Sequence, residues 1–247
     1  MRRQLSLLLS AGIFACAPSA AVVPSPAPVD APVAAAPWPR DLLWARTSAE
    51  HHALFVQGFR AARERLAGLA AERPRGTWAV IVDADETLVD NSEYQRRLHV
   101  RGTAFDSLSW DAWVRERAAT ALPGAVDYVT AVRELGGRVI VVTNREDDVC
   151  DPTRSNLQRI GLDVDLVLCR RGVSDKNPRF ESVRAGTAGG GLPALDVLQW
   201  VGDNIQDFPN LTQRAREQGA AAFALFGDRY FILPNPMYGS FERNAPR

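Results

Sequence analysis

The sequence has few of the residues that most often build metal and polyanion sites. It contains three histidines (His51, His52 and His99), and none follows a stretch that resembles a strand, so a histidine-rich zinc site is not expected. The 29 basic and 29 acidic residues give a formal net charge of zero, which argues against a nucleic acid polymer as the main partner. Lysine is almost absent: Lys176 stands alone among 28 arginines, and this exception points to a position where a guanidinium would not serve.

The apolar run at the N-terminus is too short to span a membrane and is typical of a signal peptide. Two arginines precede it, and it extends from Leu5 to Ala15. Residues 13–16 then resemble the cleavage box of a bacterial lipoprotein, which makes residues 1–15 the signal peptide and Cys16 the lipidated first residue. The alternative is ordinary cleavage near residues 20–21, which discards Cys16. Both cleavage sites predict export. Cleavage before Cys16 further predicts an outer-membrane lipoprotein that faces the periplasm or the surface and contacts the membrane only through its lipid.

Residues 16–39 differ in composition from the rest of the chain. This segment is almost entirely alanine, proline, valine and serine, cannot bury a core and is predicted to be an extended tether. The whole chain is 46% hydrophobic and 23% charged, which is ordinary globular composition. We therefore expect residues 40–247 to form a single domain around one sizeable core.

After the tether, apolar patterns of helical and strand type alternate. Residues 40–72 carry an amphipathic stripe and predict one long helix, whereas residues 91–122 lack a strong strand pattern and predict a mostly helical cap insertion. Further helices are expected at 123–135, 152–160 and 211–217, and buried strands at 78–82, 138–142, 164–169, 195–201 and 221–226. This order predicts an α/β fold, a doubly wound, Rossmann-like parallel sheet with an N-terminal helix.

Polar residues follow several of these strands, and the carboxyl ends of parallel strands share one edge of a sheet. They are Asp83, Asp85, Thr143, Lys176, Asp203 and Asp207. Clustered carboxylates require a cation, oxygen ligands favour Mg²⁺, and a hydroxyl and an ammonium suit phosphoryl oxygens. The set therefore predicts a site for a phosphoryl group and a divalent ion. For Asp83 and Asp85 taken alone, the alternative is an acidic turn after a strand that caps the next helix.

In this order, the same residues resemble the four motifs of the haloacid dehalogenase superfamily. The matching stretches are residues 83–87 with 90–92, 142–145, Lys176 and 202–208. More narrowly, the chain is similar to the secreted class C (non-specific) acid phosphatases, a branch that includes outer-membrane lipoprotein 5′-nucleotidases. Matches at Trp44, 48–50, 233–235 and 238–239 support that branch, and the resemblance covers residues 40–242.

The resemblance implies a role for each aspartate at the edge. Asp83 would be the nucleophile that forms an aspartyl-phosphate, and Asp85 would protonate the leaving alcohol and then deprotonate the attacking water. Asp83, Asp203 and the backbone carbonyl of Asp85 would hold Mg²⁺. Asp207 would orient a water bound to that ion.

The resemblance also implies that Thr143, Asn144 and Lys176 bind the phosphoryl oxygens. The implied function is that of an exported, Mg²⁺-dependent acid phosphatase acting on small phosphomonoesters, with nucleoside 5′-monophosphates as candidate substrates. Relatives suggest a homodimer, although no residue pattern in this sequence shows one.

Three aromatic residues are candidates for the pocket that receives the leaving group. They are Tyr94 in the insertion and Tyr238 and Phe241 near the C-terminus, and for each the alternative is packing within the core. Phe241 stands where relatives often carry tryptophan.

Two other functions remain open on the same fold. A catalytically weak surface protein for binding or storage would keep the fold, but it would be marked by loss of the nucleophile, and Asp83 is present. A phospho-acceptor signalling domain shares the aspartate, hydroxyl and lysine, but the signal segment and Asp85 argue against it. A phosphate-release assay separates both from a phosphatase.

Cys150 and Cys169 are the cysteines that remain besides Cys16. The first is predicted near the start of a helix and the second at the end of the next strand, so the two side chains can meet, and an oxidising compartment permits a disulfide. The alternative is a pair of buried thiols.

Overall fold

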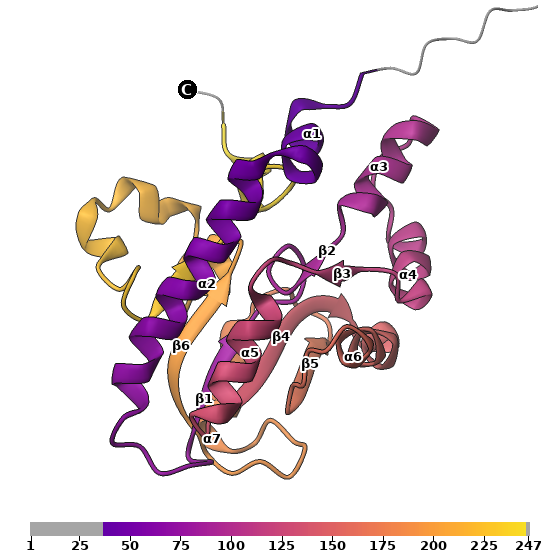
Figure 1. Cartoon of the computed structure of the whole chain (residues 1–247). Coiled ribbons are helices and arrows are strands. Elements are labelled where there is room, and N and C mark those ends of the chain that lie inside the picture. Colours follow the sequence, from indigo (N-terminus) through magenta and orange to yellow (C-terminus); the bar gives the residue numbers. More distant parts are fainter. Residues whose placement is uncertain (1–36, 246–247) are drawn as a thin grey trace, which may run out of the picture. The chain divides into compact units, whose positions relative to one another are not determined.

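The computed structural model describes residues 37–245, which are built around a five-stranded parallel sheet with strand order β5-β4-β1-β6-β7 (Figure 1). The strands are β1 (Trp78–Val82), β4 (Arg138–Glu146), β5 (Leu166–Arg170), β6 (Asp196–Gly202) and β7 (Tyr230–Ile232). Helices cover both faces, so the predicted doubly wound α/β fold is confirmed. The predicted signal peptide, Cys16 and nearly all of the predicted tether lie outside the described residues.

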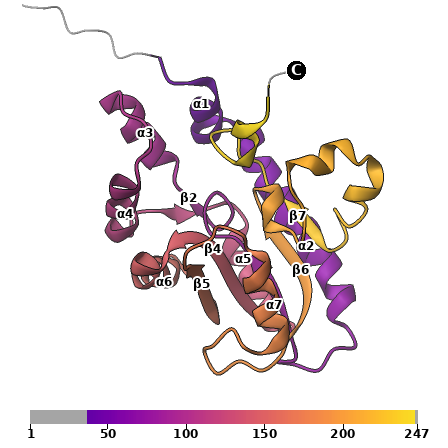
Figure 2. The ribbon, with the colours of Figure 1, turned by 180° about the vertical axis from the view of Figure 1, so that it is seen from behind.

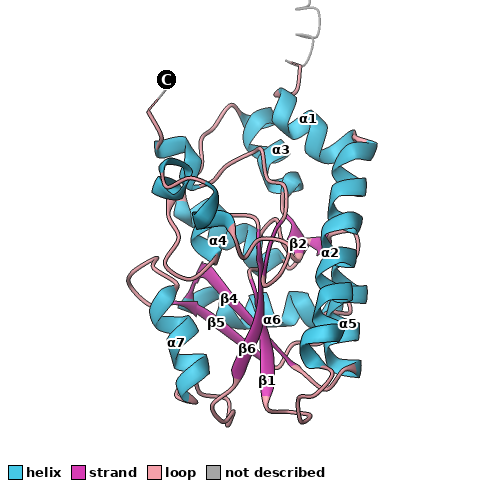
Figure 3. Ribbon diagram, turned by 90° about the vertical axis from the view of Figure 1, so that its left-hand side faces the viewer, coloured by secondary structure: helices cyan, strands magenta, loops and turns pink. Residues whose placement is uncertain are grey.

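The two faces of the sheet are covered by different helices. Helices α2 (Ala49–Ala70), α5 (Ala125–Glu134) and α6 (Cys150–Arg159) lie on one face, and α7 (Asn177–Ala185) lies on the other (Figure 3). Successive side chains of a strand point to opposite faces. In β1, Val80 and Val82 therefore pack with α2 and α5, whereas Ala79 and Ile81 pack with α7, which explains why every residue of β1 is apolar and buried.

The long N-terminal helix predicted for residues 40–72 is in fact two helices. α1 (Arg40–Thr47) ends before Ser48, whose backbone is extended (φ −84°, ψ 140°), and α2 begins after it. The Ser48 hydroxyl accepts a hydrogen bond from the backbone N–H of His51 at 3.0 Å. Serine favours this capping geometry over a position inside a helix, so the continuous apolar stripe hid a helix boundary.

The fifth predicted strand, at residues 221–226, is wrong. Residues Ala220–Phe223 form a 3₁₀ turn, and the edge strand β7 comes later, at Tyr230–Ile232, paired with β6. A short apolar run rich in alanine does not distinguish strand from helix, and two aromatic residues of β7 gain burial against β6. Residues 211–217 likewise form a 3₁₀ segment at Gln213–Glu217, and α7 was not anticipated.

The insertion at residues 91–122 is mostly helical, as predicted. Helices α3 (Ser92–Arg101) and α4 (Ser107–Glu116) stand on a two-stranded ribbon of β2 (Val89–Asp90) and β3 (Thr120–Ala121), which connects them to the sheet domain (Figure 2). α3 also contacts α1, where the Arg46 guanidinium pairs with Glu93 at 3.3 Å. Among the described residues, no helix is long and apolar enough to cross a membrane.

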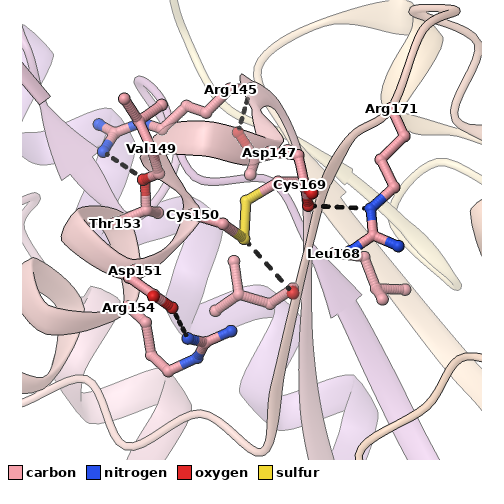
Figure 4. The surroundings of a disulfide bond; sticks show 12 residues. Arg145, Asp147, Val149, Cys150, Asp151, Thr153, Arg154, Leu168, Cys169 and Arg171 are labelled. Atoms are coloured by element: carbon pink, nitrogen blue, oxygen red, sulfur yellow. Dashed lines mark hydrogen bonds and ion pairs between the residues drawn. A yellow bond between two sulfur atoms is a disulfide. The ribbon is translucent and has the colours of Figure 1, made fainter. Parts of the chain in front are cut away.

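Cys150 and Cys169 form a disulfide (Figure 4). The bond joins the first residue of α6 to β5, and both cysteines are buried. Of the two alternatives that the sequence left open, the structure therefore has the disulfide. It ties the segment that follows β4 to the neighbouring strand.

Candidate active site

Three aspartates and the single lysine meet at the carboxyl edge of the sheet. Asp83 follows β1, Asp203 and Asp207 follow β6, and Lys176 immediately precedes α7. Lys176 Nζ lies 2.5 Å from Asp83 Oδ1 and 2.6 Å from Asp207 Oδ1. The side chains of Lys176 and Asp207 are each only 5% exposed. The structure thus brings together four of the residues expected at this edge, and it places the ammonium between two of the carboxylates.

The turn after β6 has a local reason for its sequence. A Cβ atom at Gly202 would overlap the carboxylate of Asp207, so only glycine fits where the strand ends. Asp207 Oδ2 accepts the backbone N–H of Asn204 at 2.8 Å, and the Asn204 side chain accepts the N–H of Gln206 at 3.1 Å. These reciprocal bonds form a capping box that holds Asp203 and Asp207 on the same short turn.

Burial and mutual repulsion govern the ionisation of this cluster. Burial raises the pKa of Asp83 to about 7, with Asp207 and Asp85 adding to the rise and Lys176 opposing it. Desolvation, reinforced by Asp207 and Asp83, also raises the pKa of Asp203 well above its usual range. For Lys176, burial alone would lower the pKa, but Asp207 and Asp83 outweigh it and raise the pKa, so the ammonium stays charged. One ammonium cannot balance three ionised carboxylates, so bound protons or a cation have to supply the remaining positive charge.

This cluster has the chemistry of a divalent cation site. Carboxylate oxygens of Asp83, Asp203 and Asp207 lie within 4.8 Å of one another. Hard cations prefer such oxygen ligands, and their charge would offset the repulsion that raises these pKa values. Asp203 is already oriented, because its Oδ1 accepts from Thr87 at 3.2 Å and its Oδ2 accepts from Asn235 at 2.8 Å. The residues present therefore fit a divalent metal ion.

Asp85 occupies a different environment from the other aspartates. Its Oδ1 accepts hydrogen bonds from Arg145 Nη2 at 2.7 Å, Asn91 Nδ2 at 2.9 Å and Arg145 Nε at 3.0 Å. Its Oδ2 has only longer contacts, 3.2 Å to Arg145 Nε and 3.5 Å to the hydroxyl of Thr143. One oxygen is thus held firmly while the other remains available for proton transfer.

Two adjoining cavities share this edge. The smaller, about 200 Å³, is lined by the carboxylates and Lys176. The larger, about 750 Å³, lies among α1, the cap insertion and the C-terminal segment, where Phe105 and Trp110 form part of its wall. The residues that line both are Asp85, Asn144, Tyr238, Gly239 and Arg243. The arrangement suits a small charged group in the first cavity, bonded to a larger group in the second.

The three aromatic pocket candidates have different positions. Tyr238 lines both cavities, and its buried hydroxyl has no hydrogen-bond partner among residues 37–245. Tyr94 is instead packed against Trp110 and Trp113, with its hydroxyl 2.9 Å from Ser109 Oγ, and does not line either cavity.

Phe241 does not line the cavities either. It is 41% exposed and lies against Gly239, in the turn after Tyr238. For Tyr94 the structure favours the alternative of packing, because the cap buries its ring against Trp110 and Trp113. Phe241 is exposed and lines neither cavity, so its contact with a leaving group stays a prediction.

The candidates for phosphate binding also differ. Asn144 is exposed and lines both cavities, and Lys176 lines the smaller one. Thr143 is fully buried, lines neither cavity, and its hydroxyl accepts the backbone N–H of Arg145 at 3.2 Å. The same hydroxyl lies 3.5 Å from Asp85 Oδ2, so Thr143 is next to a residue that lines the small cavity, and its role in phosphate binding stays a prediction.

Sequence reasoning assigned no role to several polar residues that complete the site. They are Glu86, Asn91, Arg145, Arg179 and Asn235. All except Arg179 lie inside stretches on which the family resemblance rests, so the sequence did draw attention to these positions. What the motifs could not supply was the partner of each side chain. Glu86, for example, is buried, and desolvation raises its pKa well above its usual range, with Asp85 and Asp203 adding to the rise.

Comparisons with known proteins agree with one another. A sequence model of the HAD superfamily, subfamily IIIB (acid phosphatase), matches residues 35–241. The class C acid phosphatase from Bacillus anthracis is 30% identical with a TM-score of 0.73, covering 82% of this chain and 85% of that chain, and the same figures hold for its tungstate-bound structure. Acid phosphatase 1 from Solanum lycopersicum is 26% identical over 164 residues, which span 66% of this chain and 59% of that protein.

Proposed function

The chain belongs to subfamily IIIB of the HAD superfamily, the acid phosphatases, and on that premise we propose that it is an exported, Mg²⁺-dependent phosphomonoesterase. The observation that carries the proposal is the convergence of Asp83, Asp85 and Lys176 with Asp203 and Asp207 on one small cavity. Its lining combines a candidate nucleophile, a candidate proton donor and a cation site. The related Bacillus anthracis protein was solved with tungstate, a tetrahedral oxyanion with the shape of phosphate.

In the first half of the reaction, a carboxylate oxygen of Asp83 attacks phosphorus. The new bond yields an aspartyl-phosphate, the bond between phosphorus and the ester oxygen breaks, and the leaving oxygen takes a proton from Asp85. Asp85 Oδ2 is the oxygen suited to this transfer, because Oδ1 already accepts three hydrogen bonds from Arg145 and Asn91. Arg145 and Asn91 thus orient the carboxyl group that moves the proton.

In the second half, a water molecule attacks the same phosphorus. Asp85 accepts a proton from that water, the bond between Asp83 and phosphorus breaks, and inorganic phosphate leaves. Lys176 lies within hydrogen-bond distance of Asp83 in the structure, and its ammonium would offset the negative charge there when the phosphoryl group arrives. Each residue returns to its starting state.

Asp83, Asp203 and the backbone carbonyl of Asp85 would hold Mg²⁺. Asp207 lies within the same carboxylate cluster, where it could either bind the ion or orient a water on it. When bound, Mg²⁺ neutralises the clustered carboxylates and stabilises the charge that develops on the transferred phosphoryl group.

For the leaving group we propose a nucleoside, which makes nucleoside 5′-monophosphates the preferred substrates. The larger cavity has the volume for such a group, and the rings of Phe105, Trp110 and Tyr238 line it. Aromatic walls favour flat groups through stacking.

We propose further that the N-terminal signal directs export and that Cys16 is lipidated, so that this activity lies outside the cytoplasm. The disulfide between Cys150 and Cys169 supports that location, because such bonds persist in oxidising compartments. Globomycin, which blocks removal of lipoprotein signal peptides, should cause a precursor to accumulate, and Cys16→Ser should abolish incorporation of labelled palmitate. Normal processing under both conditions would exclude the lipoprotein route.

The catalytic proposal is tested by Asp83→Asn. We expect this variant to release no phosphate from an aryl phosphate while it keeps a cooperative thermal unfolding transition, because the change is isosteric. Asp127→Asn, on α5, is the matched control and should keep full activity. Turnover by Asp83→Asn at the wild-type rate would exclude the aspartyl-phosphate mechanism.

A panel of phosphate esters identifies the substrate class. Phosphate release is measured on AMP, nicotinamide mononucleotide, glycerol phosphate and an aryl phosphate, before and after EDTA and with Mg²⁺ restored. We expect the nucleotides to have the highest kcat/KM and EDTA to abolish all activity reversibly. Equal rates on glycerol phosphate and AMP would reject the nucleotide preference and leave the phosphatase intact.

A further inference from the structure

Arg179, in the first turn of α7, joins three segments that surround the phosphoryl cavity. Its Nη1 donates to the backbone carbonyl of Thr143 at 2.5 Å, and its Nη2 donates to the Asn144 side-chain oxygen at 2.6 Å. Longer contacts of 3.4–3.5 Å reach the carbonyl groups of Leu168, Ser174 and Asp175. The guanidinium therefore connects the C-terminal half of β4 and the middle of β5 to the loop that precedes Lys176.

The contact with Asn144 determines which way that side-chain amide faces. A guanidinium has only donors, so the atom 2.6 Å from Nη2 has to be the amide oxygen. The amide nitrogen is then directed away from Arg179, and it has no hydrogen-bond partner among the described residues. Because Asn144 lines both cavities, it presents two N–H donors at the place where they adjoin.

The other contacts of Arg179 act on the backbone. Thr143 and Asn144 lie just beyond the part of β4 that pairs with β1, which ends at Val141, and the loop at Ser174 and Asp175 leads into Lys176. No strand pairing joins that loop to β4, because the β4–β5 register ends at Arg170. Arg179 is therefore the polar bridge between the two phosphate-binding segments.

We propose that Arg179 is a positioning residue for phosphate binding, which fixes the Asn144 amide as a donor to a phosphoryl oxygen and sets the distance between Asn144 and Lys176. This role rests on the proposed phosphatase function but concerns affinity for the phosphoryl group and not the chemical step. A lysine at this position can reach one acceptor but cannot bridge the Thr143 carbonyl and the Asn144 amide together, because its ammonium lacks the planar fork.

The test is calorimetric titration with inorganic phosphate in the presence of Mg²⁺, which requires no turnover. Arg179→Gln, Arg179→Lys and Asn144→Ala should each weaken phosphate binding about tenfold. If Arg179 acts through Asn144, the double variant Arg179→Gln/Asn144→Ala should bind only as weakly as each single variant. For an aryl phosphate, KM should rise by a similar factor with a smaller change in kcat.

Arg184→Gln is the matched control, since Arg184 lies on the same helix and pairs with Glu181 and the ring of Trp200. It should bind phosphate as the wild type does. Thermal unfolding of each variant identifies any that fail to fold, in which case Arg179→Lys decides the question. Phosphate affinity of Arg179→Lys within twofold of the wild type, or additive losses in the double variant, would overturn the proposal. A wild type that binds phosphate but hydrolyses no ester would instead refute the phosphatase function alone.

Discussion

At the scale of single residues, Lys176 is the position where side-chain size matters most. Its ammonium fits between Asp83 and Asp207, 2.5 Å and 2.6 Å from their oxygens, in a space that leaves its side chain 5% exposed. A guanidinium is wider and cannot occupy that space without moving the carboxylates apart. We predict that Lys176→Arg lowers kcat/KM for an aryl phosphate by about 100-fold or more, measured by steady-state phosphate release.

The control for Lys176→Arg is an exchange of arginine for lysine on the protein surface. Arg184→Lys should leave kcat/KM unchanged, because its side chain is 43% exposed and lines neither cavity. If Lys176→Arg kept more than about a tenth of the activity, charge alone would suffice at this position, and the scarcity of lysine would carry no meaning.

The aspartates could be predicted from sequence, but their partners could not. Asp83 follows β1 directly and Asp203 follows β6, so parallel pairing alone brings them to one edge. Arg145 was inside a matched stretch, yet its bond to Asp85 depends on rotamers that are set by packing against Trp110 and Thr153. The same holds for Arg179, which lies in a helix that no periodicity revealed. Local sequence predicts where strands end and therefore which residues lie at the edge of the sheet. The contacts of Arg145 and Arg179 form only after distant elements pack together.

At the scale of elements, the stability of the cap helix α3 depends on pH through Glu93. Hydrogen bonds from Arg96 and then Arg97, with a further contribution from Arg46, lower the pKa of Glu93 to about 2, against 4.5 in an unperturbed side chain. The stabilising contribution is therefore present above pH 4.5 and is lost as the pH falls towards 2. We predict that Glu93→Gln lowers the free energy of unfolding at pH 7 by about 1 kcal/mol or less, and lowers the melting temperature accordingly. The difference from the wild type should disappear near pH 2.

Melting curves of both proteins between pH 2 and pH 7 would measure this dependence. Glu181→Gln provides the comparison, because Glu181 pairs only with Arg184 on an exposed helix face and should shift the melting temperature little. A difference in melting temperature between wild type and Glu93→Gln that persists unchanged at pH 2 would mean that the contribution of Glu93 is not ionic.

The disulfide is the second link between elements. It closes a loop with a sequence separation of 19 residues between α6 and β5, which corresponds to about 3 kcal/mol from restriction of the unfolded chain. We predict that Cys150→Ala/Cys169→Ala lowers the melting temperature by about 6–12 °C, measured by calorimetry. Wild type with its disulfide reduced should melt at a similar temperature, and an unchanged melting temperature in the double variant would contradict the expected restriction.

Element types were predictable where length and periodicity agreed. The buried strand at 78–82 has apolar side chains on both faces, and the structure has it at Trp78–Val82. The run at 221–226 is equally apolar, yet β6 pairs instead with Tyr230–Ile232. Which of the two runs forms the edge strand is decided by pairing with β6. This pairing is a property of the assembled sheet and cannot be predicted from either run alone.

At the scale of the whole molecule, the carboxylate cluster makes stability depend on both pH and divalent cations. In the metal-free protein, burial raises the pKa of Asp83 to about 7, whereas the unperturbed value is 3.8. Between these two values, the folded protein binds a proton that the unfolded chain has released. The free energy of unfolding of the metal-free protein should therefore fall as the pH rises from about 4 to about 7.

Mg²⁺ should reverse this loss, because it binds the ionised carboxylates and so gains affinity over the same pH range. We predict that millimolar Mg²⁺ raises the melting temperature more at pH 7 than at pH 5, measured by calorimetry on EDTA-treated protein with and without the added ion. Asp83→Asn removes the titrating group, so its metal-free melting temperature should decline less with pH than that of the wild type. An equal effect of Mg²⁺ at both pH values would place the ion away from Asp83, because only a site that includes this carboxylate couples metal binding to its proton.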